Sequence, residues 1–393
     1  MTIIRFALFI GTFICLIFCA HYLLYTSTLR FLGIMDPTTR KVILWILFFL
    51  ALSFFPSAFL LRLHVNVITN LYYLISCIWL GLFLYLLMAL TAGWVVFGLG
   101  KLVGFVPNMR IVFLCLLIAA VGVSLYGLWR ARHPVFHRVE VAIDGLPDHW
   151  RNRVIVQLSD VHLGSINKTG FLERLVGKVN SLNPDLILIT GDLFDGMGGD
   201  LASFVEPLRK MKARKGILFI TGNHEGYLGL KRPLSVIRET SIKILDNEVA
   251  EIDGLQIVGV SFPEHHQKNT ARDLVTASGS YVAHKPSILM YHTPTSIEEH
   301  HADRGSQQAN TYWFPNTTMT LAKEVGIDLQ LSGHTHKGQL FPFVWLTRAI
   351  YKGYDYGLHK DGSFHLYVSS GVGTWGPPMR IGAAPEIVVI QLR

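Results

Sequence analysis

The sequence predicts two parts of different class: a membrane region of four helices, followed by an α/β domain. Long uncharged apolar stretches are confined to the first third of the 393 residues. From about residue 136 onward, short β-branched runs alternate with amphipathic helical patterns. Charge follows the same division, because residues 1–135 carry nine Lys or Arg and one acid, whereas residues 136–393 carry 26 of each sign. We therefore expect a transmembrane region over 1–135 and one soluble domain over 136–393.

Four apolar stretches are each long enough to cross a bilayer, since a helix rises ~1.5 Å per residue and the hydrocarbon layer is ~30 Å thick. None of them contains Asp, Glu, Lys or Arg. Transporters coupled to ions or protons need ionisable groups inside the membrane, so this composition favours an anchor. The first stretch is too long for a signal peptide, and no Ala-x-Ala site follows it. The predicted spans are residues 6–29, 42–61, 71–97 and 111–129.

Basic residues between the spans bear on the orientation of the chain. Four spans place both ends of the region on one side of the membrane, and each side then carries five Lys or Arg. The dense group directly after the fourth span, Arg130, Arg132 and Arg138, breaks this tie. It favours a cytoplasmic C-terminal domain at the inner membrane of a cell.

Composition also limits the partners of the soluble domain. The formal charge of +8 lies wholly in the membrane region, so the soluble part lacks the excess of positive charge that nucleic-acid binding requires. All four cysteines fall in apolar runs, which excludes a disulfide framework in the soluble part and suits a reducing compartment. The sequence leaves the oligomeric state open.

Seven short β-branched runs predict the strands of the soluble domain. Apolar residues at helical spacing over 171–179 and 201–208 predict two of the helices between them. In folds of this kind, functional loops gather at the carboxyl ends of the strands. The predicted strands are residues 139–143, 154–158, 186–189, 217–220, 255–260, 288–290 and 328–331.

Five of these runs end in a cluster containing Asp, Asn or His. Each cluster alone has a structural explanation, such as a helix cap, a turn residue or a hydrogen-bonded core histidine. Five clusters at the same class of position favour a common metal site instead. They are D-x-H at Asp160 and His162, G-D at Asp192, G-N-H-E at residues 222–225, a lone histidine at His292, and G-H-x-H at His334 and His336.

In this order, the five clusters resemble the signature of the calcineurin-like metallophosphoesterases. The resemblance covers about residues 150–393, and the segments 367–373 and 378–387 resemble the membrane-associated, phosphodiesterase-like branch. It implies a β-sandwich flanked by helices, with two metal ions at the strand ends and Asp192 between them. The implied ligands are Asp160, His162, Asp192 and His336 for one ion, and Asp192, Asn223, His292 and His334 for the other.

The residue types fit this chemistry on their own terms. Carboxylate, imidazole and amide ligands suit two divalent ions such as Mn, Fe or Zn, and the lack of thiolates argues against a closed structural zinc site. Two such ions acidify a bound water and draw charge off phosphoryl oxygens. The expected function is hydrolysis of a phosphodiester, a phosphomonoester or a pyrophosphate, of a lipid or lipid-linked substrate. The alternatives are a tethered phosphodiesterase for soluble substrates and a metal-stabilised membrane sensor without catalysis.

Four residues beside the predicted ligands have further expected roles. His224 is expected to protonate the leaving group or to contact a phosphoryl oxygen. Glu225 either orients an imidazole or only places charge in the first turn of a helix. Lys337, which stands where family members often have glycine, either meets a substrate phosphate or faces solvent. Arg380 either clamps a phosphate through two bonds or forms a structural ion pair.

Two segments have two interpretations each. The basic run 209–215 either meets anionic headgroups or is a solvated helix end. The apolar stretch 341–346 either belongs to the core or forms a lip near the metals that receives an acyl chain.

Overall fold

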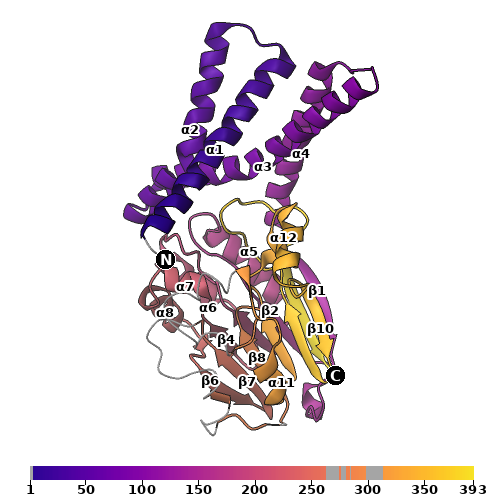
Figure 1. The fold of residues 1–393 in the computed structure, drawn as a ribbon. Coiled ribbons are helices and arrows are strands. Elements are labelled where there is room, and N and C mark those ends of the chain that lie inside the picture. The colour runs from indigo at the N-terminus through magenta and orange to yellow at the C-terminus, as the bar shows by residue number, and fades with distance from the viewer. Residues whose placement is uncertain (1–2, 263–273, 276–279, 284, 298–312) are drawn as a thin grey trace. The chain divides into compact units, whose positions relative to one another are not determined.

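A computed structural model divides the chain into two compact units (Figure 1). It describes residues 3–262, 274–275, 280–283, 285–297 and 313–393. The first unit holds residues 1–129 and the short segment 376–379, and the second holds 130–375 and 380–393. The sequence-based division at 135 and 136 lies close to this boundary, but it does not anticipate the segment 376–379.

Four long apolar helices make up most of the first unit. Within the described residues, each is long and apolar enough to cross a membrane. This confirms the predicted four-helix region, and every helix extends beyond its predicted span. The helices are α1 (Ile3–Leu32), α2 (Pro37–Leu63), α3 (Val67–Leu102) and α4 (Met109–Ala131).

Local capping fixes where two of these helices begin. The Asp36 carboxylate accepts a hydrogen bond from the Thr39 backbone N–H, and Pro37 occupies the first helical position of α2. Asn66 and Thr69 form a capping box at the start of α3. One polar capping side chain, Asp36 or Asn66, therefore marks the start of each of these two helices.

His21, the histidine inside the first predicted span, is buried and fully hydrogen-bonded. Its Nδ1 lies 2.9 Å from the Ile17 carbonyl, and Trp79 Nε1 donates to its Nε2 at 3.1 Å. Its ring also stacks on Phe83, with 3.8 Å between the centroids. Nδ1 bonds within α1 and Nε2 joins α1 to α3, so both ring nitrogens are used in holding the helix bundle together.

The second unit contains two six-stranded sheets. The first has the order β1-β12-β2-β3-β4-β5 and the second the order β10-β11-β9-β8-β7-β6. Strands β2, β3 and β4 run parallel to one another, and so do β7, β8 and β9, so each set ends at a common edge. The strands are β1 (Val135–Val141), β2 (Val154–Leu158), β3 (Leu186–Thr190), β4 (Ile217–Ile220), β5 (Lys243–Ile244), β6 (Glu248–Ile252), β7 (Leu255–Val260), β8 (Ser287–Tyr291), β9 (Leu329–Ser332), β10 (Gly357–Asp361), β11 (Phe364–Val368) and β12 (Glu386–Leu392).

The helices of this unit are short. The predicted helix over 171–179 is α5, and the prediction over 201–208 corresponds to a 3-10 turn followed by α6. The described helical elements are η1 (Asp148–Trp150), α5 (Thr169–Asn180), η2 (Leu201–Phe204), α6 (Val205–Arg209), α7 (Asn223–Tyr227), α8 (Lys231–Arg238), α11 (Thr320–Glu324), η4 (His336–Gly338) and α12 (Phe343–Ile350).

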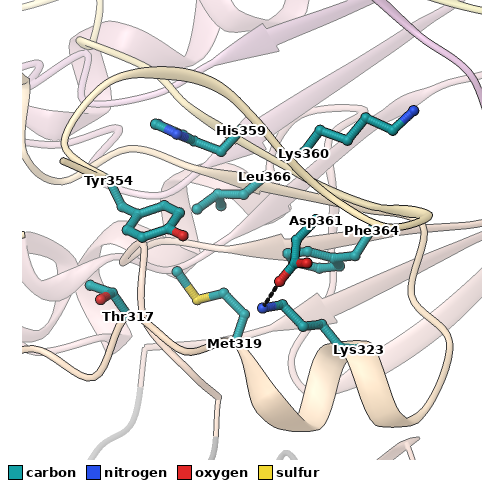
Figure 2. A pocket seen from close by; sticks show the side chains of 9 residues that line it. All are labelled: Thr317, Met319, Lys323, Tyr354, His359, Lys360, Asp361, Phe364 and Leu366. Carbon is teal, nitrogen blue, oxygen red and sulfur yellow. Dashed lines mark hydrogen bonds and ion pairs between the residues drawn. The ribbon is translucent and has the colours of Figure 1, made fainter. Parts of the chain in front are cut away.

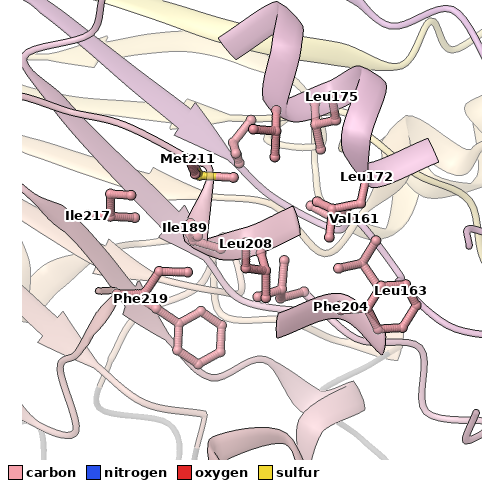
Figure 3. Packing of buried hydrophobic residues seen from close by; sticks show 14 of the residues in the cluster. Val161, Leu163, Leu172, Leu175, Ile189, Phe204, Leu208, Met211, Ile217 and Phe219 are labelled. Atoms are coloured by element: carbon pink, nitrogen blue, oxygen red, sulfur yellow. The ribbon is translucent and has the colours of Figure 1, made fainter. Parts of the chain in front are cut away.

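Alternate residues of the strands enter different cores, as the two-residue period of a strand requires. Ile155 packs between the two sheets, with side chains such as Ile257 from the second sheet. Its neighbour Val156 packs on the opposite face of the first sheet, in the cluster that includes Leu172 and Leu208 from the covering helices (Figure 3). The two sheets thus form a sandwich with helices on the outer face of the first sheet, which confirms the expected α/β sandwich.

Candidate metal centre

Each predicted ligand lies just beyond the carboxyl end of a strand. Asp160 follows β2, Asp192 follows β3, Asn223 follows β4, His292 follows β8 and His334 follows β9. Because these strands belong to the two stacked sheets and the members of each set end at a common edge, their terminal loops converge. The structure brings all seven predicted ligands together in one largely buried cluster.

The first group of donors consists of Asp160, His162 and His336. Nε2 of His336 lies 3.4 Å from Oδ1 of Asp160 and 2.9 Å from Nε2 of His162. Nε2 of His162 lies 3.9 Å from Oδ2 of Asp192. All four side chains are almost completely buried.

The second group consists of Asp192, Asn223, His292 and His334. Oδ2 of Asp192 lies 3.2 Å from Nε2 of His292, which in turn lies 3.2 Å from Oδ1 of Asn223. Nδ1 of His334 lies 3.0 Å from the same Asn223 oxygen. Donor atoms that share one ion at ~2.0–2.2 Å lie about 3 Å apart, so both groups have the spacing of a coordination site. Oδ2 of Asp192 thus lies within 3.9 Å of a donor atom in each group.

The electrostatics of the cluster also favour bound cations. Burial, reinforced by nearby positive groups, holds the pKa values of His162 and His336 well below the ordinary 6.5, so both imidazoles are neutral. Burial raises the pKa of Asp160, whereas His292 and His224 outweigh burial at Asp192 and hold its pKa well below the ordinary range. Burial likewise opposes protonation of His292, but Asp192 raises the pKa of this ring to about 10. The raised pKa of His292 therefore means that the pocket stabilises positive charge next to Asp192. Bound divalent ions would supply such charge.

The backbone of the ligand loops is held in an unusual conformation. Residues with side chains rarely adopt the left-handed region, and each such residue costs roughly 1–3 kcal/mol unless its surroundings compensate. Such conformations concentrate at functional sites. Five of the seven predicted ligands have positive φ: Asp160 (52°), His162 (50°), Asp192 (51°), His334 (71°) and His336 (49°).

Gly222 allows two ligand loops to approach each other closely. A Cβ at this position would lie only 2.2 Å from Oδ1 of Asp192 and 2.6 Å from the Asp192 backbone nitrogen. Any larger residue would push the Asp192 loop away from the loop that carries Asn223. The glycine of G-N-H-E is therefore a packing requirement of the metal centre.

Glu225 is fully buried and supports the Asp192 loop. Its carboxylate accepts hydrogen bonds from the backbone N–H groups of Asp192 (3.0 Å), Phe194 (2.9 Å) and Gly222 (2.7 Å). Burial and the nearby Asp192 raise its pKa to about 7. Glu225 lies in the first turn of α7, as the second interpretation predicts, but its carboxylate orients the backbone of two ligand loops rather than an imidazole.

Arg380 is also fully buried, and this corrects its predicted role. The guanidinium donates to the Gly373 carbonyl (3.0 Å), to the His336 carbonyl (3.1 Å) and to Nδ1 of His336 (2.9 Å). The predicted phosphate clamp is wrong because the group is enclosed in protein, and its hydrogen-bond partners are not carboxylates, as an ion pair would require. Since a guanidinium only donates, Nδ1 of His336 accepts here and the proton lies on Nε2, where a cation would replace it. Arg380 therefore positions His336.

Lys337 is turned toward an aromatic ring. Its ammonium lies over the ring of Tyr356, 4.1 Å from the centroid, and the residue itself is half-buried. A cation–π contact of this kind accounts for the lysine without a substrate phosphate.

His224 lies at the edge of the cluster, with 15% of its side chain exposed and Nε2 3.9 Å from Oδ2 of Asp192. The Gly196 backbone N–H donates to its Nδ1 at 3.1 Å, and Oδ1 of Asp195 lies 3.6 Å from the same nitrogen. Burial opposes protonation, but Asp192 and Asp195 raise the pKa of His224 to about 9. Sequence reasoning missed Asp195 and Gly196, although Asp195 follows Asp192 by only three residues.

Two other surface features lie apart from this cluster. In the basic run 209–215, Arg209 pairs with Glu206 and Arg214 with Asp185, which fits a solvated surface segment. A shallow hollow on the second sheet is lined by other residues and contains none of the predicted ligands (Figure 2). Its lining residues are Thr317, Met319, Lys323, Tyr354, His359, Lys360, Asp361, Phe364 and Leu366.

Comparison with known proteins adds three relatives and a family match. The family described as "Calcineurin-like phosphoesterase" matches residues 153–338. An uncharacterised metallophosphoesterase of Helicobacter pylori is 35% identical over 240 residues, 61% of this chain and 59% of that protein. An uncharacterised metallophosphoesterase of Campylobacter jejuni is 33% identical over 290 residues, 72% of this chain and 71% of that protein. A transmembrane protein with metallophosphoesterase domain from Danio rerio is 32% identical over 304 residues, 73% of this chain and 63% of that protein. The chain thus spans less than two thirds of the length of the Helicobacter relative.

Proposed function

Because this chain belongs to the calcineurin-like metallophosphoesterase family, we propose that it is a membrane-anchored phosphoesterase that uses two divalent metal ions. Its reaction is hydrolysis of a phosphodiester, a phosphomonoester or a pyrophosphate. The observation that carries this proposal is the position of Asp192, whose Oδ2 lies within 3.9 Å of His162 Nε2 and within 3.2 Å of His292 Nε2. One carboxylate oxygen is thereby common to two groups of donors.

The donor atoms fit two ions of the borderline class. Asp160, His162, Asp192 and His336 would hold one ion, and Asp192, Asn223, His292 and His334 the other. Neutral imidazoles combined with carboxylates suit Mn, Fe or Zn. When bound, such a pair supplies an acidified water and draws charge off the phosphoryl oxygens.

Residues around the donors prepare them for this task. The Thr190 carbonyl lies 2.8 Å from Nδ1 of His292, so this nitrogen donates and Nε2 faces the other donors. Glu225 and Arg380 act in the same way on the Asp192 loop and on His336. The orientation of the donor side chains therefore does not depend on the metal ions alone.

His224 is the proposed proton donor to the leaving oxygen. Because the Gly196 N–H points at Nδ1, the neutral ring carries its proton on Nε2, and the charged ring carries one there as well. Nε2 faces Asp192 and therefore the place where a phosphate would bind. A metal-stabilised sensor would need no such group beyond its ligands, and this favours hydrolysis over the sensor.

The catalytic domain is proposed to face the cytoplasm from the inner membrane of a cell. The support is the group of Arg130, Arg132 and Arg138 directly after the fourth span. A green fluorescent protein fused after residue 393 is expected to fluoresce in cells, whereas an alkaline phosphatase fused there is expected to be inactive. The reverse pattern would place the domain on the other side.

The activity is tested with the full-length protein in detergent, Mn²⁺ and bis(p-nitrophenyl) phosphate. Asp192→Asn is expected to abolish turnover and to lower the bound metal from two ions per chain to one or none. Asp200→Asn, the same change at an exposed acid eight residues away, is expected to leave both unchanged. Unchanged turnover in Asp192→Asn would refute the assignment of the site.

A further inference from the structure

Helix α12, with the sequence F-V-W-L-T-R-A-I, is apolar but poorly covered by the rest of the protein. Every residue of α12 is exposed or half-buried, and Trp345 is 67%, Leu346 48% and Phe343 45% exposed. Of the two interpretations of residues 341–346, a place in the core is therefore wrong. An apolar helix that leaves its large side chains uncovered marks a surface for interaction.

Trp375 extends this surface from another part of the chain. The side chain of Gln339 donates to the Trp375 carbonyl at 3.0 Å and accepts from the Trp375 backbone N–H at 3.2 Å. Trp375 is 53% exposed and is thus held beside the turn from which α12 starts. We call Phe343, Trp345, Leu346 and Trp375 the aromatic lip.

Both ends of α12 contact the turn that carries two of the proposed ligands. A Cβ at Gly338, which follows His336 by two residues, would lie 2.6 Å from the Phe343 carbonyl oxygen, so the turn and the helix touch through their backbones. After the helix, the buried ring of Tyr351 lies 6.4 Å from the ring of His334. Whatever binds the aromatic lip therefore lies next to the proposed metal centre.

The chemistry of the segment matches the surface of a lipid bilayer. Residues 337–354 contain three basic residues, Lys337, Arg348 and Lys352, and no acid. Trp, Phe and Leu on one helix together with basic residues are typical of helices that lie in the membrane interface. Anionic headgroups attract the exposed Arg348 and Lys352, while the aromatic side chains enter the boundary with the acyl chains.

A bilayer is also available to this helix. The described chain carries four helices able to span a membrane, and α4 ends at Ala131. Strand β1 begins at Val135, and the three residues between them reach only about 10 Å. The second unit is therefore connected by a short tether to helices that can span a bilayer, which makes lipid an accessible partner for an interfacial helix.

We propose that the aromatic lip docks into the bilayer interface and that the metal centre therefore acts on phosphate esters carried by membrane lipids. This proposal rests on the proposed phosphoesterase function and names its substrate class. In the reaction, the oxygen of one water forms a bond to phosphorus, the bond between phosphorus and the leaving oxygen breaks, and the leaving oxygen gains a proton while the water loses one. Docking brings the headgroup phosphate to the turn of His334 and His336.

The first test compares two substrates that carry the same reactive group. The full-length protein is placed in bilayers of phosphatidylglycerol and phosphatidylcholine with Mn²⁺. One substrate is soluble bis(p-nitrophenyl) phosphate, and the other is a diacylglycerol p-nitrophenyl phosphate in the bilayer. The double variant Trp345→Ser/Leu346→Ser is expected to lose about tenfold or more of its turnover on the lipid and less than about twofold on the soluble substrate, because two apolar side chains no longer enter the interface.

A matched control comes from the opposite end of the second sheet. Val282 is 43% exposed, and its backbone N–H donates to Gln256 at the start of β7, whereas the proposed ligands follow the ends of the strands. Val282→Ser is expected to change neither activity.

Absence of soluble turnover in the unaltered protein contradicts the proposed function itself. Soluble turnover without lipid turnover, or an equal effect of the double variant on both substrates, contradicts the lipid proposal alone.

The second test measures docking without activity. The fluorescence that Trp345 contributes is the difference between the unaltered protein and Trp345→Phe in the same bilayers. This difference is expected to be quenched by lipids with brominated acyl chains and protected from iodide in solution. Quenching by iodide alone would show an aqueous helix, and quenching by neither would show that protein covers it, such as a second copy of the chain. Either result overturns the proposal.

Discussion

The support that Glu225 gives to the metal centre leads to a prediction with a calculable size. Its Oε2 accepts from the N–H groups of Asp192 and Gly222, and its Oε1 accepts from the N–H of Phe194. In Glu225→Gln, one of the two oxygens becomes an NH₂ group that faces a donor. At best two of the three hydrogen bonds survive, and one buried N–H loses its acceptor.

Hydrogen bonds to charged groups contribute about 1.5–3 kcal/mol each, and an unsatisfied buried donor costs about 1–3 kcal/mol. We therefore expect Glu225→Gln to lower the free energy of unfolding of the second unit by about 2–4 kcal/mol. For domains of 150–250 residues, each kcal/mol lowers Tm by about 2–4 °C, so the transition should fall by about 5–15 °C. Glu225→Ala removes all three acceptors and should have a larger effect.

The assay is thermal denaturation of the full-length protein, together with metal content and turnover of bis(p-nitrophenyl) phosphate. Glu173→Gln on α5 makes the same chemical change at an exposed position and is expected to leave Tm within about 1 °C, since surface changes are usually within ±0.5 kcal/mol. If Glu225→Gln kept the Tm and the metal content of the unaltered protein, the assignment of Glu225 as a support of the ligand loops would be wrong.

Three further predictions concern single positions around the metal centre. Gly222→Ala should lower the bound metal to less than half and abolish turnover, because its Cβ would collide with Asp192. Gly226→Ala, whose Cβ meets no described atom within 4 Å, should keep both the metal and the turnover. Metal analysis of the two variants distinguishes these outcomes. His224→Gln should lower kcat by about 10²–10⁴ with two ions still bound, and loss of metal instead would make His224 a ligand. Arg380→Lys should raise the Mn²⁺ concentration needed for half-maximal turnover by at least about tenfold, since an ammonium cannot reproduce the forked hydrogen bonds of a guanidinium. An unchanged metal titration would show that Arg380 does not position His336.

The parts of the fold that the sequence predicted are those with a local signal. The four membrane helices follow from uncharged length, and the seven predicted strands follow from β-branched runs next to turns. Strands β5, β6 and β10 are missing from the prediction because they are short or largely exposed, and only pairing with a neighbour makes them strands. Strands β11 and β12 are missing although their sequences are largely apolar, and their places inside the two sheets follow from non-local pairing.

The site shows the same limit at the level of single residues. The metal-binding donors were predictable because Asp, Asn and His have few structural reasons to recur at the ends of five strands. Glu225 and Arg380 were harder, since their partners are mainly backbone groups whose positions only the fold defines. A buried carboxylate and a buried guanidinium look in the sequence like surface charges or substrate contacts, and burial reverses that interpretation.

The two buried charges also explain how strained ligand loops persist. Each left-handed ligand residue costs roughly 1–3 kcal/mol, and ligands on both sides of the centre share this conformation. Hydrogen bonds to a charged group contribute about 1.5–3 kcal/mol each, more than neutral ones. Glu225 directs such bonds to the loop of Asp192, and Arg380 directs them to the turn of His336. The loops that carry the proposed ligands are thus held by two separate charges of opposite sign, so a chain with the same seven donors but without these charges would lack the geometry proposed for two ions.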